Sequence, residues 1–322
     1  MEKLKFGIIG LGKMGGNLAA QALEKGMHVV GMTKGDPPED LLKKGLVSAE
    51  DPGDLVSQLD PPRIIMIYIH SGSALDDLIA ELEGHIQEGD VLLDGGNSYW
   101  GDSVRRYKDL KSRGIGYIDL GTSGGLNGAR HGACFMAGGE EQTVKKAEAV
   151  LKNLSVEGGY VHAGPPGAGH FVKLVHNGIE FGMLQAIGEG IDMLTHYKDD
   201  LDIADVLHCW RNGSVIRSWL IDLMEEVYAR EGGMDAIPSY IEDTGEVNWL
   251  VDDAMHMEVA VPVIAQSVMQ LFASRDKDNN AWKAIAMMRN GFGGHPFGPE
   301  KSIREGREKG RIGGFYTDGE ST

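Results

Sequence analysis

The pattern of apolar and polar positions changes character near residue 166. Before that point, short apolar runs alternate with amphipathic stretches, which predicts strands alternating with helices. Beyond it, apolar residues recur at spacings of three, four and seven, which is typical of helices. We therefore expect an α/β protein with an N-terminal Rossmann-type, doubly wound parallel sheet in residues 1–165 and an all-α domain in residues 166–322.

The predicted strands are short apolar runs at residues 4–9, 28–33, 63–69, 90–93, 116–120, 134–137 and 160–162. The predicted helices of the first half are residues 17–25, 73–83, 100–113 and 140–153. Those of the second half are residues 168–197, 202–210, 213–228, 247–273 and 278–289. We expect a kink or break near Pro262, because proline removes a helical hydrogen bond. Residues 289–296 are glycine-rich and are predicted to lie outside a helix.

The first predicted strand runs into a GxGxxG turn and then a helix. In dinucleotide-binding proteins the first glycine of this motif permits the turn and the second lets the pyrophosphate approach the backbone. The third lets the helix pack on the strand. We therefore predict that the cofactor binds at Gly10, Leu11, Gly12, Lys13, Met14 and Gly15.

The end of the second predicted strand bears on the choice of cofactor. An acidic residue there would bind the ribose of NAD, but the chain has Thr33 and Lys34 instead. A hydroxyl and a cation suit a 2′-phosphate better. The sequence favours NADP and leaves NAD open.

Three later strands are each predicted to end in a polar, glycine-containing turn. In parallel sheets, ligands gather at the carboxyl ends of strands, so these turns predict one site. The first turn contributes Ile69 and His70 and the second contributes Asn97, and we expect these three residues to bind cofactor. The third turn contributes Ser123, Gly124 and Gly125 to the site.

The helix predicted at 168–197 places Lys173, His176, Asn177 and Glu180 on one face, because spacings of three, four and seven stack side chains on one side of a helix. Such a face is either a solvated stripe or a binding surface. An ammonium and a carboxylate two turns apart lie about 10 Å apart along the axis. That separation is too large for a direct pair and suits flanking a small molecule.

Composition narrows the possible partners. The net charge of −17 disfavours nucleic acid, and an anionic substrate would need a local cationic cluster. No apolar run is long enough to span a membrane and no secretory signal is evident, so we expect a cytoplasmic location. Two cysteines offer no disulfide framework and no metal cluster, and we expect both thiols to be buried and no metal to be bound.

With these residues in view, the chain resembles the decarboxylating 6-phosphogluconate dehydrogenases in their short form, within the β-hydroxyacid dehydrogenase group. The likeness covers nearly the whole chain and lies in GLGKMGGNL, LDGGNSYW, TSGG, GAGHFVKLVHNGIEFG and RNGFGGH. It implies oxidative decarboxylation of 6-phosphogluconate to ribulose 5-phosphate and CO₂ in the pentose phosphate pathway. It also implies that the helical domain serves substrate binding and oligomerisation.

The resemblance further implies roles for single residues. Lys173 matches the family's general base and Glu180 its general acid, while His176 and Asn177 match substrate-binding positions in the catalytic centre. The other positions that match substrate-binding residues are Asn97, Ser123, Gly124 and Gly125. Arg289 and His295 match a tail pair that reaches the neighbouring subunit's site, which implies a homodimer or a homotetramer.

Two positions depart from the family pattern, because Phe181 and Glu246 stand where the long enzymes have a Tyr and a Lys that touch the substrate phosphate. The segment WRNGSVIRSW offers Arg217, and less readily Arg211, as a replacement cation. A non-decarboxylating dehydrogenase acting on a small semialdehyde, and a non-catalytic dinucleotide-binding sensor, are the alternative functions.

Overall fold

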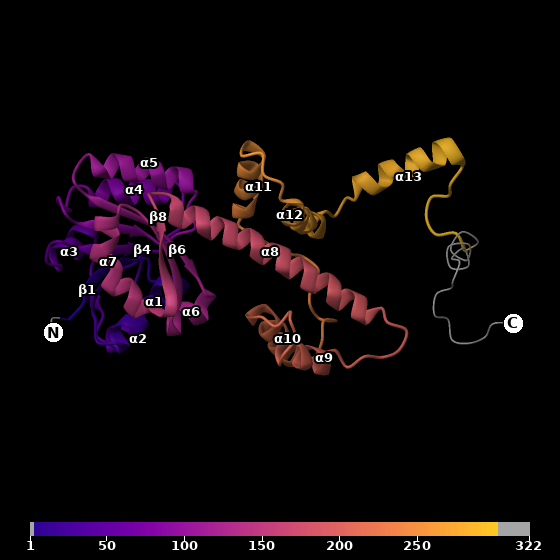
Figure 1. The fold of residues 1–322 in the computed structure, drawn as a ribbon, viewed down its shortest axis with the longest axis horizontal. Helices are drawn as coiled ribbons and strands as arrows, with labels where there is room; N and C mark the ends of the chain where they lie inside the picture. Colours follow the sequence, from indigo (N-terminus) through magenta and orange to yellow (C-terminus); the bar gives the residue numbers. More distant parts are fainter. Residues whose placement is uncertain (1–2, 302–322) are drawn as a thin grey trace. The chain divides into compact units, whose positions relative to one another are not determined.

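The computed structural model describes residues 3–301, and its N-terminal part is an eight-stranded sheet in the order β3-β2-β1-β4-β5-β6-β7-β8 (Figure 1). The strands are β1 (Lys5–Ile9), β2 (His28–Met32), β3 (Val47–Ser48), β4 (Ile64–Ile67), β5 (Val91–Asp94), β6 (Gly116–Ser123), β7 (Ala133–Gly138) and β8 (Ser155–Gly164). The α/β class and the Rossmann-type sheet are confirmed.

One pair of neighbouring strands departs from the predicted parallel sheet, because β6 and β7 are antiparallel. Only residues 124–132 join them, and they contain the short helix α6 (Gly125–His131). A parallel connection needs a crossover of roughly a dozen residues or more, so this linker is too short to provide one.

The remaining helices of the N-terminal part are α1 (Lys13–Glu24), α2 (Glu39–Lys43), α3 (Pro52–Ser57), α4 (Ser73–Leu82), α5 (Trp100–Lys111) and α7 (Glu141–Leu154). They cover both faces of the sheet. Successive strand residues point to opposite faces, so Ile8 packs with α1 and α7, whereas Ile9 packs with α3 and α4. Both faces therefore have a dry core, as a doubly wound sheet requires.

Helices follow the sheet as predicted, and the first, α8 (Ala168–Thr195), matches its predicted bounds closely. The others are α9 (Ile203–Arg211), α10 (Trp219–Glu231), α11 (Glu246–His256), α12 (Pro262–Arg275) and α13 (Asn280–Gly293). The break predicted near Pro262 is present, because α12 begins at that residue. Within residues 3–301, no helix is both long and apolar enough to cross a membrane.

Two helix predictions were wrong at their ends. The helix predicted from residue 213 begins at Trp219, because Ser218 caps it by accepting a hydrogen bond from the Ile221 amide. The helix predicted to end at residue 289 continues to Gly293, and Gly294 ends it with a left-handed φ of 63°. Glycine lowers helix propensity but does not forbid helix, so the pattern placed the end too early.

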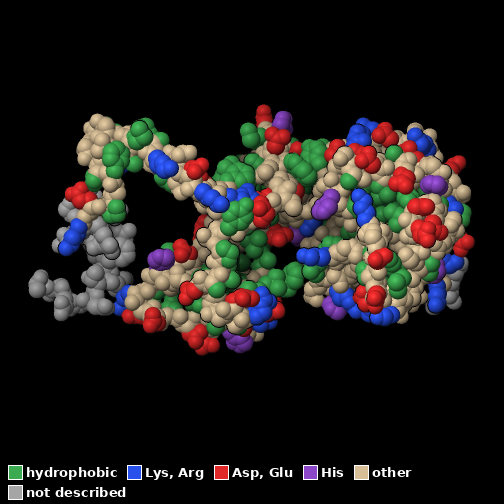
Figure 2. All heavy atoms as spheres, turned by 180° about the vertical axis from the view of Figure 1, so that it is seen from behind, with side chains coloured by type: hydrophobic (Ala, Val, Ile, Leu, Met, Phe, Trp, Pro, Cys, Tyr) green, Lys and Arg blue, Asp and Glu red, His purple; other side chains and the backbone are tan. Residues whose placement is uncertain are grey.

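Contacts group the chain into two compact units. The first contains the sheet and continues to Ile237, and it also includes Asp243–Met269. Among the described residues, the second contains Pro238–Glu242 and residues 270–301. The domain boundary predicted between residues 165 and 166 stays a prediction. On the sheet part, acidic and basic side chains are interspersed in the face shown in Figure 2.

Candidate active site

The glycine-rich turn lies between β1 and α1, and two of its glycines are required by close backbone approaches. A Cβ at Gly10 would lie 2.3 Å from the Tyr68 carbonyl oxygen, and one at Gly15 would lie 2.0 Å from the Gly10 carbonyl oxygen. A Cβ at Gly12, beside the N-terminus of α1, would meet no atom within 4 Å. The backbone is therefore open at the glycine where a pyrophosphate would approach, and the helix N-terminus favours an anion there.

The residues predicted around this turn differ in exposure. Leu11 is buried and Met14 is half-buried, whereas Lys13 is exposed. A cavity of ≈ 310 Å³ begins at Gly12 and Lys13 and runs along α1 toward α2. Thr33 and Lys34 follow β2, with Thr33 half-buried and Lys34 exposed. The cavity therefore adjoins the open glycine turn, and it includes neither Thr33 nor Lys34.

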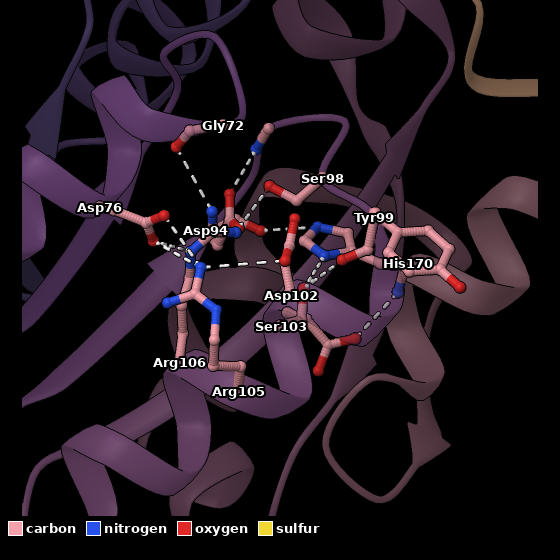
Figure 3. A network of polar contacts seen from close by, with 12 residues as sticks. Gly72, Asp76, Asp94, Ser98, Tyr99, Asp102, Ser103, Arg105, Arg106 and His170 are labelled. Carbon is pink, nitrogen blue, oxygen red and sulfur yellow. Dashed lines mark hydrogen bonds and ion pairs between the residues drawn. The ribbon is translucent and has the colours of Figure 1, made fainter. Parts of the chain in front are cut away.

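The turns after β4 and β5 share one buried support, drawn in Figure 3. Arg106 of α5 donates to Asp76 at 2.7 Å and to the Gly72 carbonyl at 3.4 Å. Its Nη1 lies 3.6 Å from Asp94 Oδ2. The Asp94 carboxylate in turn accepts hydrogen bonds from Ser98 at 2.7 Å and from Tyr117 at 2.9 Å. This network fixes the turn that carries Asn97.

The start of α8 is fixed by one carboxylate from the middle of β6. Asp119 is fully buried and accepts from the Gly167 amide at 2.7 Å and from the His170 amide at 2.9 Å. Burial raises the pKa of Asp119, and the two amide donors oppose that effect. The His170 ring lies 3.1 Å from the Asp94 carbonyl oxygen and 2.7 Å from Ser103 Oγ. Sheet, turn and helix are thus joined at one buried point.

Backbone contacts bring the predicted polar face of α8 against the sheet. A Cβ at Gly169 would lie 2.2 Å from the Asp119 carbonyl oxygen, and one at Gly121 would lie 2.6 Å from Lys173 Cβ. Lys173 is consequently half-buried, and this burial is the main cause that lowers its pKa. The charges of Glu180 and Glu246 act in the opposite direction.

The other predicted residues of this face form a connected group. His176 Nε2 lies 3.0 Å from Ser123 Oγ at the end of β6. His176 Nδ1 lies 3.2 Å from Asn177 Oδ1 and 3.8 Å from Glu180 Oε2. Because Asn177 Oδ1 can only accept, a proton on His176 Nδ1 is directed at it. The polar face predicted from spacing therefore forms a connected, half-buried group beside the end of β6, and its role as a binding surface stays a prediction.

Glu246 joins this group although the sequence analysis assigned it no positive role. Asn97 Nδ2 donates to Glu246 Oε1 at 2.9 Å, and Asn177 Nδ2 lies 3.5 Å from the same oxygen. Both asparagines, Lys173 and Glu246 line a cavity of ≈ 10 Å³, about the size of one water molecule. Glu246 begins a helix after a loop, so no periodic pattern connects it to the site.

Helix α11 is held over this cavity by a second set of contacts. Asp253 accepts from Tyr99 at 2.9 Å and from the Trp100 indole at 2.7 Å. Burial and the Asp253 carboxylate raise the pKa of Tyr99 to about 12, so Tyr99 remains a donor. The start of α5 and the middle of α11 are thereby tied together beside Glu246.

The remaining predicted residues are placed as follows. Gly124 and Gly125 have left-handed φ angles of 102° and 57° and form the turn into α6. Ile69 is half-buried and His70 is exposed in the turn after β4. Arg289 and His295 belong to the second unit, and their role at a neighbouring subunit stays a prediction.

Both cysteines are exposed, so the prediction of buried thiols was wrong. Cys134 of β7 lies directly opposite Ser123 of β6 in the antiparallel ladder, at the edge of the candidate site. Among residues 3–301, no three His, Cys, Asp or Glu side chains come together to hold a metal ion.

A Rossmann-type sheet with an open glycine turn, followed by a helix that brings a lysine of lowered pKa to the strand ends, defines an NAD(P)-binding dehydrogenase. Residues 5–163 match the NAD-binding domain of 6-phosphogluconate dehydrogenase, and residues 169–301 match the C-terminal domain of that enzyme. The chain therefore belongs to the 6-phosphogluconate dehydrogenase family.

Two relatives of similar length illustrate the match. YqeC of Bacillus subtilis, whose name assigns it provisionally to the 6-phosphogluconate dehydrogenases, is 41% identical over 91% of this chain and 98% of its own. The NAD⁺-dependent, decarboxylating 6-phosphogluconate dehydrogenase of Haloferax volcanii is 35% identical over the same shares.

Solved structures agree with this placement. The 6-phosphogluconate dehydrogenase of Plasmodium falciparum, studied with NADP⁺ and with 6-phosphogluconate, superposes with a TM-score of 0.78 at 26% identity, over 94% of this chain and 68% of that one. The 3-hydroxyisobutyrate dehydrogenase of Mycobacterium tuberculosis shares the fold at a TM-score of 0.67 and 18% identity, over 85% of this chain and 95% of that one.

Proposed function

We propose that this protein oxidises 6-phosphogluconate at C3 and decarboxylates the product to ribulose 5-phosphate and CO₂, with reduction of NADP or NAD. The observation that carries the proposal is the half-buried Lys173 with its lowered pKa, placed among Asn97, Asn177 and the His176–Ser123 pair. Family membership and the substrate complex of the Plasmodium enzyme support the same substrate.

Lys173 is the general base in this mechanism. Its neutral amine removes the proton of the C3 hydroxyl, and burial makes that neutral form accessible at working pH. The bound nicotinamide accepts the hydride from C3. The resulting 3-keto acid loses CO₂ from C1 when the electrons of the breaking bond move to the ketone oxygen, which takes its proton back from Lys173.

Glu180 completes the reaction as the general acid. The enediol left after decarboxylation needs one proton at the carbon that becomes C1 of ribulose 5-phosphate. Glu180 lies two turns along α8 from Lys173 and is half-buried on the same face. The Ser123 hydroxyl and the backbone of Gly124 and Gly125 are proposed to hold the carboxylate that leaves as CO₂.

The direct test is to measure initial rates with 6-phosphogluconate and with gluconate, using NADP and NAD in turn and following CO₂ release in parallel. We expect equal amounts of reduced cofactor and CO₂ from the phosphorylated acid, and loss of both in Lys173→Met. Lys145→Met, which changes an exposed lysine on α7, is the matched control. Reduced cofactor without CO₂ would indicate the non-decarboxylating alternative, and cofactor binding without turnover of either acid would indicate the sensor.

The substrate phosphate is proposed to bind Arg217. Arg211 is already committed to Glu225 at 2.8 Å and to Asp222 at 3.4 Å, whereas no ion pair of Arg217 is seen among the residues the structure describes. Arg217 is exposed, and Trp219, two residues on, approaches Gly125, with Cη2 3.7 Å from the Cβ position of that glycine.

The phosphate proposal predicts that Arg217→Ala raises KM for 6-phosphogluconate and leaves KM for gluconate unchanged. Arg230→Ala removes an exposed arginine of α10 that pairs with its neighbour Glu231, and it serves as the control. An unchanged KM for the phosphorylated acid would remove Arg217 from the site.

The cofactor is proposed to be NADP in preference to NAD. Two exposed cations, Lys13 in the glycine turn and Lys34 shortly after β2, support a 2′-phosphate. The relatives include an enzyme named as NAD⁺-dependent, so the rates with the two cofactors decide the preference.

A second copy of the chain is proposed as the protein partner, in a homodimer or homotetramer. Several side chains of the apolar face of α8 are exposed in the single chain, among them Ile179, Met183 and Leu184. The helix α13, which carries Arg289, is apolar and exposed as well, with Trp282 at 69% and Phe292 at 76%. Sedimentation equilibrium measures the state, and a monomer at micromolar concentration would contradict the proposal.

A further inference from the structure

Glu246 is a carboxylate in the site that the mechanism above does not use. It is the first residue of α11, and its Oε1 accepts from Asn97 Nδ2 at 2.9 Å, with Asn177 Nδ2 at 3.5 Å. Its Oε2 accepts from the Thr244 hydroxyl. One side chain therefore links the turn after β5, the middle of α8 and the start of α11.

These contacts determine which atoms face the open side of the site. An amide that donates through Nδ2 to Glu246 presents its Oδ1, and an Oδ1 can only accept a hydrogen bond. Asn97 is exposed, and no partner of its Oδ1 is seen within residues 3–301. Glu246 Oε2 has capacity for one more donor beyond Thr244. This side of the site is consequently a wall of acceptors.

The charges on this side point the same way. The titratable groups that face Lys173 are Glu180 and His176 from α8, Glu246 from α11 and Cys134 from β7. Two carboxylates, Glu180 and Glu246, therefore accompany Lys173. A phosphate dianion beside Glu246 would meet repulsion, whereas sugar hydroxyls would find acceptors.

We propose that Glu246 is a specificity-determining residue that binds the hydroxyl groups of a polyhydroxy acid and orients the amides of Asn97 and Asn177. The inference rests on the proposed function, because it takes the sugar acid as substrate. It assigns the hydroxyl-bearing middle of that acid to the wall formed by Glu246 and Asn97.

The test compares Glu246→Gln with Glu246→Asp, using Asp252→Asn as the control. Gln keeps the length and removes the charge, whereas Asp keeps the charge and withdraws it from the two amides. Asp252 is an exposed carboxylate of the same helix that pairs with His256. We expect both Glu246 variants to lose about tenfold to hundredfold in kcat/KM, and by the same factor for 6-phosphogluconate and gluconate.

A selective gain for the phosphorylated acid in Glu246→Gln would overturn the proposal, because it would place the phosphate beside α11. Unchanged kcat/KM for both acids in both variants would also overturn it. The Asp variant provides the same comparison if the Gln variant does not fold.

A second measurement needs no turnover. The pH dependence of Lys173 acylation by an amine-reactive reagent, read by peptide mass spectrometry, reports the titration of that amine. We expect Glu246→Gln to move the midpoint to lower pH by several tenths to about one pH unit, and Glu246→Asp and Asp252→Asn to move it far less. An unmoved midpoint in Glu246→Gln would contradict the placement of Glu246. A wild-type protein inactive on both acids would refute the proposed function and leave this measurement valid.

Discussion

Replacing Gly169 with alanine tests the close packing of α8 on the sheet. The Cβ would lie 2.2 Å from the Asp119 carbonyl oxygen, 2.5 Å from the Met136 carbonyl oxygen and 2.6 Å from the Gly138 amide nitrogen. All three atoms are backbone of β6 and β7, so no side chain can rotate away. Restoring an ordinary contact of about 3.4 Å requires α8 to move by roughly 1 Å.

The expected magnitude follows from two opposing effects. Alanine favours helix over glycine by about 1 kcal/mol, while overpacking a tight core costs about 1–3 kcal/mol and occasionally more. Because the new Cβ would clash with three backbone atoms, we place the steric cost at the upper end of that range. We expect the free energy of unfolding to fall by about 2 kcal/mol. A displacement near 1 Å at Lys173, one turn along the helix, would lower kcat/KM by about a hundredfold.

The assay is urea unfolding together with steady-state kinetics, and α8 supplies its own control. Gly188 lies in the same helix and has nothing within 4 Å of its Cβ position. Gly188→Ala is therefore expected to raise the free energy of unfolding by about 0.5–1 kcal/mol and to leave kcat/KM unchanged. If Gly169→Ala were as stable and as active as Gly188→Ala, the close approach of α8 to the sheet would be refuted.

Three further outcomes are expected. Lys173→Met should abolish turnover and yet raise the free energy of unfolding at pH 7. Burial lowers the pKa of Lys173, so the protonated amine costs stability as the pH falls from the unfolded pKa toward the folded one. Urea unfolding at pH 7 and pH 10 should therefore show a smaller stability gain for the variant at pH 10. Trp100→Phe removes the indole donor to Asp253 and should lower the free energy of unfolding by about 1–3 kcal/mol. Thermal unfolding measures this, with Trp249→Phe as the comparison. An unchanged melting temperature would show that the hydrogen bond between α5 and α11 is dispensable. Lys34→Ala should raise KM for NADP about tenfold without changing KM for NAD, and equal changes for both cofactors would exclude a 2′-phosphate contact.

Local patterns predicted the parts of the site that lie on one element. The spacing of Lys173, His176, Asn177 and Glu180 sufficed to place them on one face of α8, because the helical period is fixed by backbone geometry. The glycine turn was predictable for the same reason, since its strand, turn and helix follow one another in the chain. The bounds of α8 and the break at Pro262 also follow from local chemistry.

What the sequence could not supply is pairing between distant elements. Glu246 meets Asn97 across 149 positions of the chain, and nothing in a helix that begins after a loop marks that meeting. The antiparallel pairing of β6 and β7 was not predicted, because α6 is short and its residues show no clear helical period. The exposure of Ile179 and Met183 could not be predicted, because periodicity identifies an apolar face but not what covers it.

The anchoring of α8 at Asp119 has a consequence for how this protein can change over evolutionary time. Lys173 and Glu180 lie within the first turns after the anchored end, and the helix then continues to Thr195. Because the sheet fixes the positions of Lys173 and Glu180, substitutions near Gly188 or Gly190 can alter the far half of the helix and leave the proposed base and acid in place. Substitutions at Asp119, Gly138 or Gly169 cannot do so. The proposed catalytic face and the distal surface of α8 are therefore open to separate selection, although one unbroken helix carries both.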